Sequence, residues 1–199
     1  MKKILNVISS ARGGASVSVQ LSNVVIDKLK ERYPGSTVTI RDLVADKYPH
    51  LEESHLNAFF APAENETPAS REAARHSNDA IREVQEADII VIGVPTYNFS
   101  VPSALKAWID HLVRAHKTFA YTNGRAEGLL KGKKVYLAIA SGGVFSQGAM
   151  KDFDYAEPYL RFILSFIGLN DITTFRAEGL SVPGIQETAL QKGIESVAV

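Results

Sequence analysis

The amino-acid sequence predicts a doubly wound α/β fold, in which helices cover both faces of a five-stranded parallel sheet with strand order 2-1-3-4-5. Short β-branched runs alternate with longer amphipathic stretches along the whole chain, which is typical of repeated strand-helix units. The middle runs are almost entirely apolar, as strands covered on both faces should be. The chain has 199 residues, and we expect a single domain over residues 1–199 that buries about 70% of the surface of the unfolded chain.

The apolar runs place the strands at residues 3–8, 37–41, 89–94, 135–140 and 172–175. The amphipathic stretches between and after them predict helices at residues 18–32, 70–85, 102–115, 155–167 and 185–197. The first helix ends before Pro34-Gly35, and Pro102 suits the first turn of the third. Residues 46–68 have no steady period, and we expect a long connection there with a short helix.

Composition excludes several classes of protein. Twenty-two Lys and Arg residues balance twenty-two Asp and Glu residues, which argues against a general nucleic-acid binder because such binding needs a concentrated positive field. The chain has no cysteine, so disulfides, thiolate nucleophiles and cysteine-bound metals are excluded. No apolar run approaches the roughly 18 residues of a membrane span, and the first residues lack a signal-peptide core. We therefore expect a cytoplasmic protein with no membrane partner.

The loop after the first strand has the composition of a phosphate site. Residues 9–18 contain four serines and two glycines, and they lead into the first predicted helix. Such residues let backbone N–H groups approach an anion, add hydroxyl donors, and place the anion at a helix N-terminus. The alternative is a serine-rich turn with an ordinary N-cap.

Two further loops follow the third and fourth strands, and the predicted strand order brings them to the same edge of the sheet. Residues 95–102 combine aromatic rings, an amide and two prolines, which suits the wall of a planar heteroaromatic ligand. Residues 140–146 contain Gly142-Gly143, whose uncovered backbone amides can reach polar ring edges. Alternatively, these are ordinary tight turns, but three of them at one edge would then be a coincidence.

The chain resembles the FMN-dependent NADH azoreductases and NAD(P)H:quinone oxidoreductases, a family with the flavodoxin-like fold. The resemblance runs nearly from end to end, through Ser16-Val17-Ser18 and Tyr97-Asn98-Phe99 to the segments 119–122 and 127–134. The order and spacing of these motifs carry it, rather than any single motif.

The resemblance implies an FMN site made of the three loops. The first loop would hold the phosphate, the second would lie along the flavin ring, and the third would meet the polar edge of the ring. The residues so implicated are Ser10, Ser16, Val17 and Ser18; Thr96, Tyr97, Asn98 and Phe99; and Ala140, Ser141, Gly142 and Gly143. Arg12 lies outside the positions that the resemblance supports.

The resemblance also implies a reaction and an assembly. NADH or NADPH would reduce the flavin and leave, after which a quinone or an azo compound would take two electrons, so that no side chain need act as acid or nucleophile. The family forms homodimers with the site at the interface, which makes Tyr121 and Phe119 candidates for the pocket wall, from the other subunit. The alternative is that both are core aromatics.

Two departures from the family's pattern concern the flavin ring. Some members have Met where Thr96 stands, and Ser-Arg-Gly-Gly where this chain has Ala140 to Gly143. Without that arginine, a positive charge near the ring must come from elsewhere, which affects the redox potential and the choice of nicotinamide.

Three other readings of the sequence predict different chemistry. A flavodoxin-type electron carrier would share the fold and FMN, but such carriers are usually strongly acidic. A hydrolytic triad of Ser141 with Asp110 and either His111 or His116 would lack the Gly-x-Ser-x-Gly turn. A phosphoacceptor domain would need acidic residues where Ser9 and Ser10 stand. No metal site is expected, because His50, His55 and His76 lack ligand spacing, and we expect these three side chains to be solvated.

Overall fold

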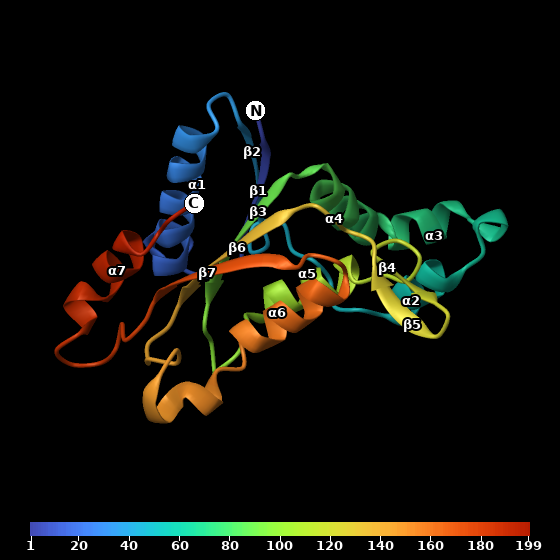
Figure 1. Cartoon of the computed structure of the whole chain (residues 1–199). Coiled ribbons are helices and arrows are strands. Elements are labelled where there is room, and N and C mark those ends of the chain that lie inside the picture. Colours follow the sequence, from blue (N-terminus) through green and yellow to red (C-terminus); the bar gives the residue numbers. More distant parts are fainter.

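The structure is a computed structural model that describes residues 1–199, apart from the side chain of residue 63. Five parallel strands form one sheet in the order β2-β1-β3-β6-β7 (Figure 1). They are β1 (Lys3–Ile8), β2 (Thr37–Asp42), β3 (Ile89–Pro95), β6 (Lys134–Ala140) and β7 (Asp171–Ala177). The predicted five-stranded parallel sheet is confirmed, and its strands agree within two residues at either end.

The strand order differs in detail from 2-1-3-4-5, because two strands that we did not predict come between β3 and β6. These are β4 (Phe119–Thr122) and β5 (Arg125–Gly128), which pair only with each other as an antiparallel hairpin. The hairpin lies at the side of the main sheet and is held there by backbone contact with the turn before β7. The Leu130 N–H donates to the Ile167 carbonyl at 2.9 Å. A Cβ atom on Gly128 would lie 2.1 Å from the Gly168 nitrogen, so only glycine fits there.

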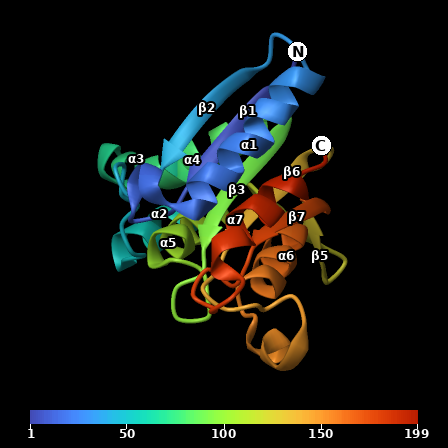
Figure 2. The same cartoon turned by 90° about the vertical axis from the view of Figure 1, so that its left-hand side faces the viewer.

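Helices cover both faces of the sheet. One face carries α1 (Val17–Arg32) and α7 (Gln186–Glu195), which lie side by side in front of the sheet in Figure 2. The other face carries α4 (Arg75–Glu86), α5 (Ser103–Leu112) and α6 (Glu157–Phe166). Each face has its own buried cluster of aliphatic side chains, as expected for central strands that are apolar on both sides.

The remaining helices, α2 (Glu53–Phe60) and α3 (Pro68–Ala73), lie in the connection between β2 and α4. Residues 70–85 form not one helix but two, α3 and α4, which meet at Ala74. The connection 46–68 contains the expected short helix, α2, and a turn of 3-10 helix, η2 (Ala63–Asn65). Two more such turns, η1 (Gly13–Ala15) and η3 (Gly148–Phe153), lie in the loops after β1 and β6. No helix among the described residues is long and apolar enough to cross a membrane.

Candidate active site

The loops after β1, β3 and β6 meet at the carboxyl edge of the sheet. The parallel register places Ile8 beside Gly93, and Pro95 beside Ala140, so these strands end together. A cavity of about 150 Å³ opens between the loops. Its lining comes from all three loops and from the segment after β7: Ser10, Arg12, Ser16, Val17, Pro95, Thr96, Tyr97, Ala140, Ser141, Gly142, Leu180 and Ser181.

The N-terminus of α1 points at this cavity without a side-chain cap. Ser16 precedes the helix in extended conformation, but its hydroxyl lies 3.0 Å from the Ser18 hydroxyl instead of capping the helix. The first N–H groups of any helix lack intrahelical partners. The buried Ser16 side chain and the free N–H groups of the first turn therefore form an anion cradle.

Two other serines of this loop hold its shape. The Ser9 hydroxyl donates to the Gly93 carbonyl at 2.7 Å and thereby fastens the loop to β3. The Ser10 hydroxyl accepts the Arg12 N–H at 3.2 Å and lies 3.4 Å from the Tyr97 phenol oxygen. Gly93 also lets α1 approach β3, because a Cβ atom there would lie 3.3 Å from the Ser18 carbonyl oxygen. The cradle is therefore tied to the neighbouring strand.

The loop after β3 makes a tight reversal. Tyr97 and Ser100 exchange two backbone hydrogen bonds of 3.0 and 3.1 Å, and Asn98 and Phe99 between them have φ of 49° and 68°. Positive φ at both central positions is the geometry of a type I′ turn. Asn adopts it readily, whereas Phe seldom does, so the turn holds Phe99 in a costly conformation. Its ring is 47% exposed and faces the Phe145 ring edge-on at 6.0 Å.

Asn98 faces a second, larger hollow on the other side of this turn. That hollow has a volume of about 590 Å³ and lies between the turn, α5 and α6. Tyr97 borders both hollows. Tyr159 also lines the second one, and burial raises the pKa of its phenol to about 12, so the phenol stays protonated near neutral pH.

The loop after β6 is joined by backbone hydrogen bonds to the segment that follows β7. The Ser181 N–H donates to the Gly142 carbonyl at 2.9 Å, and the Gly179 N–H donates to the Gly143 carbonyl at 3.0 Å. The Ser141 hydroxyl also donates to the Gly143 carbonyl, at 2.8 Å. These bonds occupy the two carbonyl groups and leave the N–H groups of both glycines without a partner among the described residues. They are donors available to a polar ring edge.

Comparison with known proteins decides the family. A family model described as a flavodoxin-like fold matches residues 2–198. An FMN-dependent NADH:quinone oxidoreductase of Herminiimonas arsenicoxydans is 49% identical over 92% of this chain and 89% of its own length. Another, from Beijerinckia indica, is 42% identical over 100% of this chain and 98% of its own. The chain belongs to the family of FMN-dependent NADH:quinone oxidoreductases.

Solved structures agree with this assignment. An azoreductase from Bacillus anthracis strain Sterne superposes with a TM-score of 0.90 at 31% identity, covering 98% of this oxidoreductase and 96% of that chain. An FMN-dependent NADH-azoreductase from Bacillus anthracis strain Ames Ancestor, solved in complex with FMN, superposes with a TM-score of 0.87 at 27% identity. It covers 98% of this chain and 95% of its own. The resemblance inferred from the sequence is confirmed.

The cavity of this oxidoreductase brings together most of the residues expected from the sequence. Eight of them line it: Ser10, Ser16, Val17, Thr96, Tyr97, Ala140, Ser141 and Gly142. Ser18 is fully buried and does not line the cavity, Gly143 comes directly after Gly142, Asn98 lines the second hollow, and Phe99 lines neither. Arg12, which the resemblance does not support, lines the cavity as well.

Phe119 and Tyr121 do not line the cavity of their own chain. Both belong to the β4-β5 hairpin, which lies at the right of Figure 1, far from the loop after β6 at the lower left. Phe119 packs on Phe166 with ring centroids 4.7 Å apart, in the manner of a core aromatic. Tyr121 is 67% exposed. Their role as a wall from a second subunit stays a prediction.

Sequence reasoning missed Leu180 and Ser181. A signal was present, because the fifth strand is followed by Glu178-Gly179, and its carboxyl end had to lie at the same sheet edge as the other three loops. The hydrogen bonds of this segment to Ser141 and Gly142 make it a fourth part of the site.

The triad reading does not hold for this oxidoreductase. The Ser141 hydroxyl donates to a backbone carbonyl, and the His111 ring bonds the Pro49 carbonyl at 3.0 Å among the helices α2, α4 and α5. The expectation of solvated histidines is wrong for His55, which is buried against His111 with ring centroids 5.1 Å apart. Among the described residues, no group of His, Asp and Glu is arranged to hold a metal.

The largest hollow lies at the opposite edge of the sheet. Its volume is about 680 Å³, and its lysines already have partners: Lys2, Lys131 and Lys134 pair with carboxylates, and Lys133 donates to the carbonyls of Gln85 and Ala87. In doubly wound sheets, ligands bind beyond the carboxyl ends of the strands. The smaller cavity is therefore the candidate site, despite its size.

Proposed function

We propose that this chain transfers two electrons from NAD(P)H to quinones and to azo compounds by a ping-pong mechanism, with FMN held between the loops after β1, β3 and β6. The observation that carries the proposal is the N-terminus of α1, which has no side-chain cap and whose residues Ser16 and Val17 line the cavity. A phosphate there would accept hydrogen bonds from the first-turn N–H groups and from Ser16. The residues present fit FMN.

The chain's own groups have distinct tasks in this site. When bound, FMN supplies the redox chemistry, because its ring accepts a hydride and gives up two electrons. The turn from Thr96 to Phe99 would line one face of the ring, and the stiff reversal at Asn98 and Phe99 fixes the position of that turn. The free N–H groups of Gly142 and Gly143 would hold the polar ring edge and could stabilise negative charge there.

One site serves both substrates in turn. The chain has no Gly-x-Gly-x-x-Gly motif for a separate dinucleotide site, so we propose that NAD(P)H and the acceptor use the same open surface above the ring. Sequential occupation of one surface is the structural condition for ping-pong kinetics. Cleavage of an azo bond to two amines takes four electrons and therefore two such turnovers.

The cavity of a single chain is too small for the whole cofactor. About 150 Å³ suits a phosphate and its surroundings, whereas small-molecule pockets usually measure about 300–1,000 Å³. We propose that a second copy completes the pocket in a homodimer, and that its Tyr121 provides a wall. The exposed ring of Tyr121, remote from its own cavity, supports this arrangement.

A flavodoxin-type electron carrier is the competing function, and turnover without a partner protein separates the two. Purified chain loaded with FMN is mixed with NADH and menadione, and NADH oxidation is followed by absorbance. We expect steady turnover and parallel double-reciprocal plots, together with bleaching of an azo dye such as methyl red. A yellow protein that oxidises NADH only when a protein acceptor is added would be a carrier. A colourless protein that takes up no FMN would refute the site itself.

A further inference from the structure

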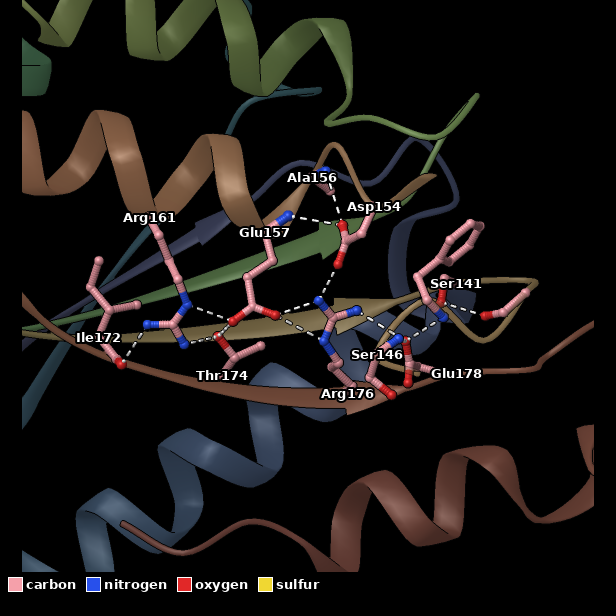
Figure 3. Close-up of polar contacts among 12 residues, drawn as sticks. Ser141, Ser146, Asp154, Ala156, Glu157, Arg161, Ile172, Thr174, Arg176 and Glu178 are labelled. Carbon is pink, nitrogen blue, oxygen red and sulfur yellow. Dashed lines mark hydrogen bonds and ion pairs between the residues drawn. The ribbon is translucent and has the colours of Figure 1, made fainter. Parts of the chain in front are cut away.

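A partly buried cluster of charged side chains lies beside the loop after β6 (Figure 3). Its centre is Arg176 on β7, whose guanidinium contacts three carboxylates, those of Asp154, Glu157 and Glu178. The four side chains are only 11–16% exposed. The sequence analysis did not single out any of them, and the proposed chemistry uses none.

Glu178 links this cluster to the loop. One of its carboxylate oxygens accepts the backbone N–H groups of Phe145 and Ser146, each at 2.9 Å, and also the Arg176 Nη1 at 3.0 Å. Hydrogen bonds to a charged acceptor are about twice as strong as neutral ones. The carboxylate therefore fixes the loop two residues beyond Gly143.

The other end of the cluster fixes the segment that returns from the loop to α6. Asp154 accepts the N–H groups of Ala156 and Glu157, at 3.1 and 3.2 Å, and Arg176 holds Asp154. Glu157 also accepts bonds from Thr174 and Arg161. Burial by itself would raise the pKa of Glu157, but the hydrogen bonds from Thr174, Arg176 and Arg161 outweigh it and lower that pKa. Glu157 thus stays charged at neutral pH.

The charged cluster is also connected to the turn after β3. Phe145, whose N–H is held by Glu178, presents its ring to the edge of Phe99. The Tyr155 N–H donates to the Phe99 carbonyl at 3.3 Å. The cluster around Arg176 is thus connected to both sides of the proposed ring site. One side is formed by the Gly142 and Gly143 N–H groups and the other by the Asn98-Phe99 turn.

We propose that Glu178 and Arg176 are positioning residues for FMN: they hold the loop 141–146 so that the Gly142 and Gly143 N–H groups face the ring. This inference rests on the proposed FMN site. The two side chains act through the loop and do not touch the cofactor. Arg176 contacts both Glu178 and Asp154, so it is connected to the loop 141–146 and to the segment 154–157 that leads into α6.

Hydrogen exchange of the protein without FMN tests the positioning directly. Glu178→Gln replaces the charged carboxylate by a neutral amide, which accepts hydrogen bonds less strongly. We therefore expect the Phe145 and Ser146 N–H groups to exchange about tenfold faster. FMN affinity, measured by quenching of flavin fluorescence, should fall by about the same factor, and the midpoint potential of bound FMN should become lower. Asp171→Asn is the matched control, because Asp171 begins the strand β7 that Glu178 follows, and its carboxylate pairs with Lys134 at the far sheet edge. It should change none of these values.

A second, conservative variant distinguishes a loss of positioning from misfolding of Glu178→Gln. Arg176→Lys keeps one charge but cannot reach three carboxylates, so we expect intermediate exchange and intermediate affinity. Fast exchange in Glu178→Gln with wild-type affinity and potential would overturn the positioning role and leave the proposed function intact. Exchange at the wild-type rate would also overturn it. A wild-type chain that binds no FMN would overturn both proposals.

Discussion

The hydroxyl of Ser16 is buried, yet its hydrogen-bond partner is another serine rather than the helix that follows it. An N-cap serine normally accepts an N–H of the first turn, and loss of that bond costs about 1 kcal/mol of stability. Here the helix end stays open, and the hydroxyl pair can turn toward an anion. We therefore expect Ser16 to contribute to the binding of FMN more than to the stability of α1.

Replacement of Ser16 tests whether its side chain contributes to FMN binding rather than to the stability of the helix. We expect Ser16→Ala to raise the dissociation constant for FMN about tenfold, through loss of one donor to the phosphate, with little change in the free energy of unfolding without FMN. Ser22→Ala is the control, because Ser22 is equally buried on α1 but its hydroxyl donates to the Val19 carbonyl, away from the cavity. Fluorescence titration and urea unfolding measure the two quantities. Equal affinities for Ser16→Ala and Ser22→Ala would remove Ser16 from the site.

At the scale of the elements, α2 is attached to the rest of the fold through histidines. His111 of α5 is fully buried between His55 of α2 and His76 of α4, with Tyr48 and Phe59 around it. Its Nε2 bonds the Pro49 carbonyl, and its Nδ1 has no partner among the described residues. Burial lowers the pKa of both His111 and His76, so the folded state favours their neutral forms.

The sign of this shift predicts a loss of stability in mild acid. As pH falls below the unfolded-state pKa of 6.5, the unfolded chain takes up protons that the folded chain does not, and the free energy of unfolding decreases. Urea unfolding at several pH values between neutral and about 5 should show this decrease above the range where carboxylates titrate. His111→Gln keeps a side-chain N–H donor but does not titrate, and its profile should be flatter. Identical slopes in both proteins would contradict the assignment to His111.

The three central strands were predicted well for one reason, namely that their burial follows from a local pattern. Strands β1, β3 and β6 are covered on both faces, so their apolar runs mark them without knowledge of the neighbours. The β4-β5 hairpin has no such run, because its strands are short and largely exposed. Its position depends on the backbone fit of Gly128 against Gly168, which no local pattern encodes.

At the scale of the whole molecule, the proposed homodimer makes two predictions that can be measured. We expect light scattering to give about twice the mass of one 21.7 kDa chain. Tyr121→Ala should lower kcat/KM for quinones without unfolding the protein, because the ring is 67% exposed in the single chain. Ile40→Ala, which truncates a 62% exposed side chain on β2, is the control. It should change neither the mass of the assembly nor kcat/KM. A monomer with full activity would contradict the shared pocket.

The sequence by itself determined the parallel sheet, the positions of its strands, and the loops that carry the site, because alternating apolar runs and small polar turns are local signals. Most of the expected lining residues do meet in one cavity. Only the tertiary structure decided what supports that cavity. Glu178, directly after the neighbouring strand β7, contacts the loop after β6 across 32 residues of chain at Ser146, and Arg176 contacts Asp154 across 22. Such contacts depend on which strands become neighbours, and that is settled when the whole sheet packs.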